Sequence, residues 1–304
     1  MDTTTNYEHD PKIRTVRAKI QGFLDYVEGT FHVRDVYDAL GARTVEEKAA
    51  IRKGLSREKG QTIESGGTYG VWHKIDKDIK WFDLSEIEQY ALERLPAKFS
   101  LGLHHMIDFQ DGDLIVIAGL SSSGKSGFEL ETGRKNLGSM KVNYLSSEVT
   151  LAGIHKKAQD NKPPIDLQSL KGLRFAMRTD NFQDLIEPGA LNLIDYLSPP
   201  SLGDEPKYFA IPHLLSKIHQ SLKGKGLAVV SLQKDPGKKS GEGGFKTYQK
   251  ANLYLTLDRD EQGRFWANIE KCKVRPDLHR YRLQYEPQPF ELIPLSDWMP
   301  PKGK

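Results

Sequence analysis

Residues 113–126 have the sequence DLIVIAGLSSSGKS, and this stretch decides the fold. Its first six residues are mostly apolar, which is typical of a short buried strand. Residues 119–126 then match the pattern Gly-x-x-x-x-Gly-Lys-Ser, in which a glycine-rich loop leads into a helix and its backbone N–H groups receive phosphate oxygens. Strand, loop and helix together predict an α/β domain in which a mainly parallel sheet is flanked by helices.

Each residue type in this loop suits one part of a nucleotide. We expect Lys125 to reach the β- and γ-phosphates and Ser126 to ligate Mg²⁺, while Gly124 lets the backbone approach where a side chain would block it. ATP and Mg²⁺ are therefore the predicted cofactors. The residues predicted to bind the nucleotide are Gly119, Ser121, Ser122, Ser123, Gly124, Lys125, Ser126 and Gly127.

Three further apolar runs lead to polar residues that suit ATP hydrolysis. One run closes with Asp195, a candidate second ligand for the metal. Another is followed by Glu148, and a carboxylate just beyond a central strand can act as the base that polarises the attacking water. A third ends in Gln233, a candidate sensor of the γ-phosphate. The alternatives are an ordinary strand-end aspartate, a loop or helix-terminal glutamate and a merely polar glutamine. The three runs are residues 190–195, 141–145 and 227–233.

A glycine- and lysine-rich segment, residues 234–246, follows the last of these runs. Lysine side chains can neutralise phosphates and aromatic rings can stack on bases, while glycines permit rearrangement. We therefore predict a mobile loop that contacts nucleic acid; a solvated loop without a partner is the alternative. The residues predicted to make this contact are Lys238, Lys239, Phe245 and Lys246.

The first hundred residues predict a smaller domain of the winged-helix type. Apolar residues recur at helical spacing in 13–27 and in 33–40, so two helices are expected. Thr44 and Glu47 have the spacing of a capping box at the start of a third helix. Residues 61–75 alternate around glycines, as a β-hairpin would. Three helices followed by a hairpin is the winged-helix order.

In winged helices the third helix can enter the DNA major groove. Here that helix offers basic side chains for duplex DNA, although such a domain can equally mediate protein contacts. These candidate DNA-contacting residues are Arg52, Lys53 and Arg57. The predicted organisation is a flexible tail (1–10), a winged-helix-like domain (11–80), a linker helix within 81–96 that spans 83–95, and an ATPase domain (97–304).

Composition and charge exclude several classes of protein. The net charge of +3 is too small to indicate nucleic-acid binding by itself. Cys272 is the single cysteine, which excludes an intramolecular disulfide and a cysteine-cluster metal site. No apolar run approaches the roughly 18 residues that span a bilayer, and the polar start lacks the features of a signal peptide. We therefore expect a cytoplasmic protein with no membrane partner.

Several segments together resemble the C-terminal motor domain of the DnaB-family replicative helicases, within the wider RecA-like class of P-loop ATPases. They occur in the family's order and approximate spacing, and the likeness covers about residues 97–290. The resemblance implies an oligomeric ATPase, in which identical subunits form a ring or a short filament and the motor domain binds single-stranded DNA. The segments are GDLIVIA (112–118) with the phosphate loop after it, YLSSE (144–148), LIDYL (193–197) and LTLDRDE (255–261).

The resemblance also implies that ATP lies between subunits and that the neighbouring subunit supplies basic residues to the γ-phosphate from a late strand. Lys271 and Lys273 stand at the matching place. Their Lys-x-Lys spacing is similar to that of RecA, whereas DnaB-like proteins have Lys-x-Arg, and Arg275 is an alternative cation. The remaining family roles fall on Lys125 and Ser126 for phosphate and metal, Glu148 for the base, Asp195 for the metal and Gln233 for the sensor.

The sequence departs from the DnaB family at its front, where a winged-helix-like segment stands in place of the helical collar that supports the ring and binds primase. We expect a DNA-binding ATPase that moves along, unwinds or remodels DNA in replication or recombination of a phage or mobile element. One alternative is an ATP-switched DNA-binding regulator or loader. Another is an interaction scaffold whose nucleotide pocket is structural and slow.

Overall fold

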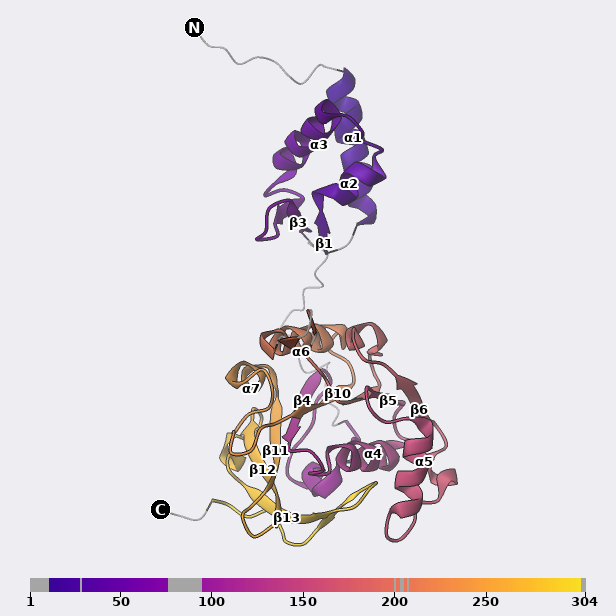
Figure 1. Ribbon diagram of the computed structural model, residues 1–304, viewed down its shortest axis with the longest axis vertical. Helices are drawn as coiled ribbons and strands as arrows, with labels where there is room; N and C mark the ends of the chain where they lie inside the picture. Colours follow the sequence, from indigo (N-terminus) through magenta and orange to yellow (C-terminus); the bar gives the residue numbers. More distant parts are fainter. Residues whose placement is uncertain are drawn as a thin grey trace, which may run out of the picture. The chain divides into compact units, whose positions relative to one another are not determined.

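The computed structural model describes residues 11–27, 29–75, 95–199, 201–202, 205–206 and 208–301. The chain divides into two compact units, Met1–Tyr90 and Ala91–Lys304 (Figure 1). The predicted tail lies outside the described residues, as does the linker helix predicted over 83–95 except for its last residue, Leu95. Within the described part of the chain, no helix is both long and apolar enough to cross a membrane.

The first unit packs three helices against a small antiparallel sheet with the strand order β1-β3-β2. Strand β1 was not predicted, because three residues are too few to show an alternating pattern; its Phe31 pairs with Trp72 of β3. The core of this unit is made by Ile20, Leu24, Val36, Ile51, Leu55 and Ile63. Its elements are α1 (Pro11–Tyr26), β1 (Thr30–His32), α2 (Val33–Ala39), α3 (Val45–Glu58), β2 (Ile63–Ser65) and β3 (Val71–Lys74).

Local sequence signals set the start of α3 and the end of α2. Thr44 caps α3 through a reciprocal box, in which its hydroxyl accepts from Glu47 N at 3.2 Å and the Glu47 carboxylate accepts from Thr44 N at 2.9 Å. Gly41 follows α2 with φ +66°, a left-handed conformation that glycine adopts without steric cost. Both signals had been visible in the sequence.

The second unit is built on a nine-stranded sheet with the order β14-β13-β12-β11-β4-β10-β7-β5-β6. A separate two-stranded pair is formed by β8 (Ser201–Leu202) and β9 (Glu205–Pro206). The strands of the large sheet are β4 (Asp113–Gly119), β5 (Val142–Ser146), β6 (Leu173–Met177), β7 (Leu191–Asp195), β10 (Leu227–Gln233), β11 (Leu253–Arg259), β12 (Phe265–Cys272), β13 (Arg282–Pro287) and β14 (Leu292–Pro294). The α-helices are α4 (Lys125–Asn136), α5 (Leu151–Asp160), α6 (Ile211–Ser221) and α7 (Phe245–Lys250).

Six neighbouring strands of this sheet, from β11 to β6, run parallel, and β12, β13 and β14 add an antiparallel edge. Helices cover both faces of the parallel part (Figure 1). Alternate residues of β4 therefore enter two different cores: Ile115 packs with Phe128 of α4, and Val116 packs with Leu215 of α6. This architecture confirms the predicted α/β fold with a mainly parallel sheet flanked by helices.

The segment 234–246 differs from the mobile loop that we predicted. Helix α7 begins at Phe245, so Phe245 and Lys246 are helical. The helix forms because Thr247 is buried and its hydroxyl contacts Gly244 O at 2.7 Å and Tyr254 Oη at 3.2 Å. At the other end Lys234 is buried and forms an ion pair with Asp258. Tertiary contacts, which the local composition does not reveal, therefore hold both ends of this segment.

Candidate functional site

The loop between β4 and α4 has the shape of a phosphate cradle. Gly124 has φ +95°, and a Cβ at this position would lie only 2.5 Å from Leu292 Cδ2, so only glycine fits. The loop is held from below by Tyr285, whose hydroxyl donates to Ser123 O at 2.7 Å. Helix α4 begins at Lys125, so the backbone N–H groups of its first turn face the cradle.

Lys125 lies over this loop with its ammonium held by neutral acceptors. Its Nζ donates to Gly119 O at 3.0 Å, to Leu120 O at 2.9 Å and to Gln233 Oε1 at 3.0 Å. Burial lowers the pKa of Lys125, and the negative charges of Asp195 and Glu148 oppose that shift. No acceptor in direct hydrogen-bond contact with the ammonium is charged, so an anion such as phosphate would be favoured there.

The carboxyl ends of the parallel strands gather the remaining predicted groups around the same hollow, which has a volume of about 620 Å³. Gln233 closes β10 beside Gly119 of β4, and Asp195 closes β7 beside Ser146 of β5. Glu148 follows β5 by two residues. The hollow is lined by Ser121, Ser122, Gly124, Lys125, Ser126, Gly127, Glu148, Lys157, Asp195, Tyr196, Gln233, Pro287, Gln288 and Pro289.

Of the predicted nucleotide-binding residues, Gly119 and Ser123 do not line this hollow. Ser123 is buried, and the carbonyl of Gly119 accepts from Lys125 and from Lys234 N at 3.1 Å. A Cβ on Gly119 would lie 2.4 Å from Ser123 Oγ and 3.1 Å from the Leu257 side chain. These two residues shape the loop from behind, where a side chain at 119 would not fit.

The donor set fits a Mg²⁺ ion that arrives with a nucleotide rather than a resident metal. Among the residues that the structure describes, no group of three or more His, Cys, Asp or Glu side chains could hold a metal ion. Ser126 and Asp195 line the hollow together, and Tyr144 Oη donates to Asp195 Oδ2 at 2.6 Å. One buried carboxylate oxygen is thus fixed by Tyr144 and the other remains for a cation. Mg²⁺ commonly binds through one or two protein oxygens together with phosphate and water.

Glu148 meets the steric requirement for a base that acts on water. Its side chain is exposed at the mouth of the hollow, and its backbone N–H donates to Ser146 Oγ at 3.2 Å, which fixes the turn after β5. A carboxylate in this place can accept a proton from a water molecule that enters the hollow.

A second buried glutamate, Glu129 on α4, lies behind the phosphate loop. Ser231 Oγ donates to its Oε1 at 2.6 Å, while its buried Oε2 has no partner among the described residues. Burial, and secondarily the charge of Asp195, raise the pKa of Glu129 well above its ordinary value. This carboxyl group is therefore predominantly protonated over a wider pH range than an exposed glutamate.

The predicted trans-acting cations lie at the opposite end of the sheet. Lys273 N donates to Asn252 O, and Asn252 N donates to Leu114 O, near the start of β4. The Lys271 ammonium instead donates to Tyr248 O, Gln249 O and Ala251 O at 3.0, 3.2 and 2.6 Å, and so caps the end of α7. Arg275 is paired with Asp277 at 2.7 Å. Of these three cations, Lys273 alone is exposed with no hydrogen bond or ion pair to its side chain among the described residues.

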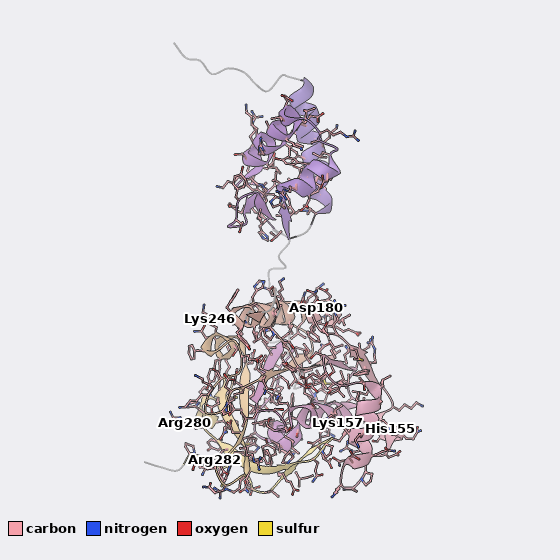
Figure 2. The ribbon with its side chains drawn as sticks, in the orientation of Figure 1. His155, Lys157, Asp180, Lys246, Arg280 and Arg282 are labelled. Carbon is pink, nitrogen blue, oxygen red and sulfur yellow. The ribbon has the colours of Figure 1, made fainter. Side chains whose placement is uncertain are left out.

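The residues predicted to contact nucleic acid fall into two groups in this unit. Lys238 and Lys239 are exposed in the loop after β10, and Phe245 and Lys246 are exposed on α7 (Figure 2). Phe245 is 69% exposed and stacks on Tyr248 with ring centroids 5.9 Å apart. An exposed ring that is held in place by a second ring is a suitable platform for a base.

In the first unit the structure separates the three predicted DNA-contacting residues. Arg52 lines a hollow between α3 and the β2–β3 turn, together with Arg34 and the aromatic residues Tyr37, Tyr69 and Trp72. Lys53 and Arg57 instead line a second, mainly apolar hollow on the α1 side of α3. The three cations therefore do not form one surface.

Sequence reasoning missed several residues of the nucleotide hollow. Tyr144 was quoted only as part of a motif, and its contact with Asp195 depends on two strands that are far apart in the sequence. Nothing in the sequence around Lys157 marked it. The Pro-Gln-Pro run at 287–289 indicates a turn, but only the folded chain shows that this turn reaches α4.

Comparison with known proteins supports the fold. No protein-family model matches the chain, and no curated protein matches it. The KaiC-like protein PH0186 from the hyperthermophilic archaeon Pyrococcus horikoshii OT3 superposes with a TM-score of 0.55 and 17% identity, over 67% of this chain and 100% of that one. The ATPase domain of a DnaB-family protein superposes with a TM-score of 0.54 and 15% identity, over 70% of this chain and 95% of that one. The second unit thus has the fold of RecA-like P-loop ATPase domains.

Proposed function

We propose that the chain binds Mg²⁺-ATP and hydrolyses it, and that it does so as a homo-oligomer that acts on DNA. The observation that carries the proposal is the convergence of Lys125, Ser126, Glu148, Asp195 and Gln233, from four separate strand ends, on one hollow. The description of a fold neighbour as an ATPase domain supports it. Chance seldom brings a phosphate cradle, a metal-binding carboxylate and a free carboxylate to one place.

In the proposed reaction the protein positions charge and moves one proton. When bound with the nucleotide, Mg²⁺ supplies Lewis-acid stabilisation of the phosphate charge, and Ser126 and Asp195 would hold it. Glu148 accepts a proton from water as the water oxygen bonds to the γ-phosphorus and the bond to the β–γ bridging oxygen breaks, which gives ADP and phosphate. Lys125 stabilises the charge that builds on the phosphate oxygens.

Gln233 connects this chemistry to the loop after β10. In the structure its amide oxygen accepts from Lys125, and its backbone carbonyl accepts from Glu242 N at 2.8 Å. A phosphate that engages Lys125 competes for that ammonium, so the partner of the Gln233 side chain changes when nucleotide binds. The loop that carries Lys238 and Lys239 begins one residue later, and in this proposal it responds to the nucleotide and contacts single-stranded DNA together with Phe245 and Lys246.

The experiment that tests the function measures ATP hydrolysis with and without single-stranded DNA for the wild type, Lys125→Ala and Glu148→Gln. We expect DNA to stimulate the wild type. Glu148→Gln should retain ATP binding and lose about 10²- to 10⁴-fold in turnover, while Lys125→Ala should lose both. Wild-type turnover in either variant would refute the assignment of the site.

A second candidate function is an ATP-switched DNA-binding regulator or loader. The separate fold of the first unit favours it, because helices α1 to α3 followed by the β2–β3 hairpin have the order of a winged helix. Its hollow combines Arg34 and Arg52 with aromatic rings, and Tyr69 at the turn is 90% exposed. Sequence-selective duplex binding by the full chain, with ATP turnover indifferent to DNA, would favour this candidate over a motor.

A further inference from the structure

The nucleotide hollow has a second end that the phosphate chemistry does not use. Glu148, Asp195 and Gln233 mark the end where hydrolysis is proposed, and the phosphate loop lies in the middle. The far end is made by Lys157 near the end of α5 and by the turn 287–289, which follows β13 (Figure 2). Sequence and fold assign no role to these groups.

The turn is a fixed wall, because the residues that follow it are tied to two helices. Asn161, fully buried after α5, accepts from Phe290 N at 3.1 Å and donates to Glu291 Oε1 at 2.9 Å. Arg134 of α4 donates to Glu291 Oε2 at 3.2 Å. Gln288 N donates to Glu291 O at 2.9 Å and closes the turn.

The wall also packs directly against the phosphate loop and the start of α4. A Cβ on Gly127 would lie 3.0 Å from Gln288 O, and a Cβ on Gly124 would lie 3.2 Å from Pro287 Cβ. Both approaches are possible because these positions carry no side chain. A ligand whose phosphates lie on the loop would therefore extend along Pro287, Gln288 and Pro289.

Lys157 stands at the same end of the hollow. It lies one helical turn before Asn161, the residue that holds the wall, and about 10 Å along α5 from the Glu148 end by the usual helical rise. Its ammonium has no partner among the described residues, and its side chain is half-buried. Lys156, its neighbour on α5, is exposed and pairs with Asp160 at 2.9 Å instead.

We propose that this end is the base subsite of the nucleotide pocket, where a purine ring lies against the flat faces of Pro287 and Pro289. The Gln288 amide, which can donate and accept, hydrogen-bonds the edge of the base, and the Lys157 ammonium donates to its ring nitrogens or to the ribose oxygens. This inference rests on the proposed function, since it concerns the same pocket. It adds the residues that distinguish a nucleotide from a bare polyphosphate.

The test compares the affinity of the full chain for Mg²⁺-ATP with its affinity for inorganic tripolyphosphate, which has the phosphates and no base. We expect wild type to bind ATP more tightly. Gln288→Ala and Lys157→Ala should each weaken ATP binding about tenfold, the value of one well-placed hydrogen bond, and leave tripolyphosphate binding within about twofold. Thermal unfolding checks that both variants are folded.

The chain offers a matched control for each variant. Gln284→Ala removes the same amide from β13 at a position outside the hollow, and Lys156→Ala removes the neighbouring ammonium of α5. Neither should change ATP binding. Equal weakening of both ligands by Gln288→Ala and Lys157→Ala, or no weakening of either, would overturn the base subsite.

The wild type separates this inference from the function on which it rests. If it binds tripolyphosphate as tightly as ATP, the base subsite is wrong while the phosphate site stands. If it binds neither ligand, the proposed ATPase function fails together with the subsite.

Discussion

The two ends of the central sheet of the second unit carry different chemistry. At the carboxyl ends of the parallel strands, Glu148, Asp195 and Gln233 surround the Lys125 ammonium in one hollow. At the amino ends, the Lys271 ammonium is bound to the carbonyls of α7 and Lys273 is exposed. One end has a nearly complete set of catalytic groups, and the other has a cation without a use inside its own subunit.

Distance explains what this difference means. Lys273 lies beside Leu114, and by the usual rise of a strand about 16 Å of β4 separate Leu114 from Gly119 at the phosphate loop. A lysine side chain cannot cover that distance, so Lys273 cannot reach the nucleotide of its own subunit. If it acts in hydrolysis, it acts on a second copy of the chain.

The largest expected effect comes from breaking this division of labour. Lys273→Ala should lower turnover by about 10³-fold, as removal of a cation from the transition state does, while leaving ATP binding to the isolated pocket intact. Lys271→Ala should act differently, because it frees the carbonyls at the end of α7; we expect reduced thermal stability with a smaller loss of turnover. The measurements are steady-state ATP hydrolysis and thermal unfolding.

Mixing variants sharpens the same test. In an equimolar mixture of Lys273→Ala and Glu148→Gln subunits, some interfaces combine a wild-type Glu148 with a wild-type Lys273 from its neighbour. Activity that recovers above that of either variant alone would support action between subunits. An inactive mixture of subunits that still assemble would contradict it.

A smaller effect is expected at the carboxyl end itself, from Tyr144→Phe. This change removes the hydroxyl that donates to Asp195 at 2.6 Å and leaves a buried carboxylate oxygen without its partner. Groups that orient a metal ligand commonly contribute 10- to 100-fold in metal affinity, so the Mg²⁺ concentration for half-maximal ATP binding should rise about tenfold. Lys273→Ala should not shift this Mg²⁺ requirement, and a shift there would blur the distinction between the two ends.

The smallest effect concerns stability and follows from Glu129, buried behind the phosphate loop. Because its pKa is raised in the folded chain, the folded state holds a proton that the unfolded state loses, and stability falls as pH rises above the ordinary glutamate pKa. Glu129→Gln keeps an acceptor for Ser231 and removes this penalty. We expect a gain on the order of 1 kcal/mol at pH 8, or about 2–4 °C in Tm.

The pH dependence is the control for Glu129. The gain in Tm should shrink toward zero near pH 4, where the carboxyl group is protonated in both states. A gain that is equal at pH 4 and pH 8 would show that packing, rather than ionisation, is responsible.

Most of the carboxyl end could be predicted from the sequence because its signals are local. A buried strand is a run of apolar residues, and the residue that closes it lies at a known edge of a parallel sheet, so Asp195 and Gln233 could be placed without a structure. The phosphate loop is a continuous motif. The same locality explains why the cap at Thr44 was correctly predicted from two residues.

Predictions based on composition were less successful. The segment 234–246 is rich in glycine and lysine, yet Tyr254 Oη accepts from Gly241 N at 2.9 Å and Asp258 pairs with Lys234. These partners lie on β11, beyond the segment itself. Likewise Arg52 and Lys53 are adjacent in sequence but line different hollows, because neighbouring residues of a helix point in directions about 100° apart.

The sequence by itself determined the strand, the phosphate loop and the identity of the groups that could handle phosphate, since these depend on contiguous residues and on the period of a strand. Only the tertiary structure decided which distant side chains share the hollow: Tyr144 against Asp195, Tyr285 under Ser123, and Lys157 with Gln288 at the far end. Sheet order and hairpin register set these meetings. They arise from burial over the whole unit, which a local stretch of sequence does not encode.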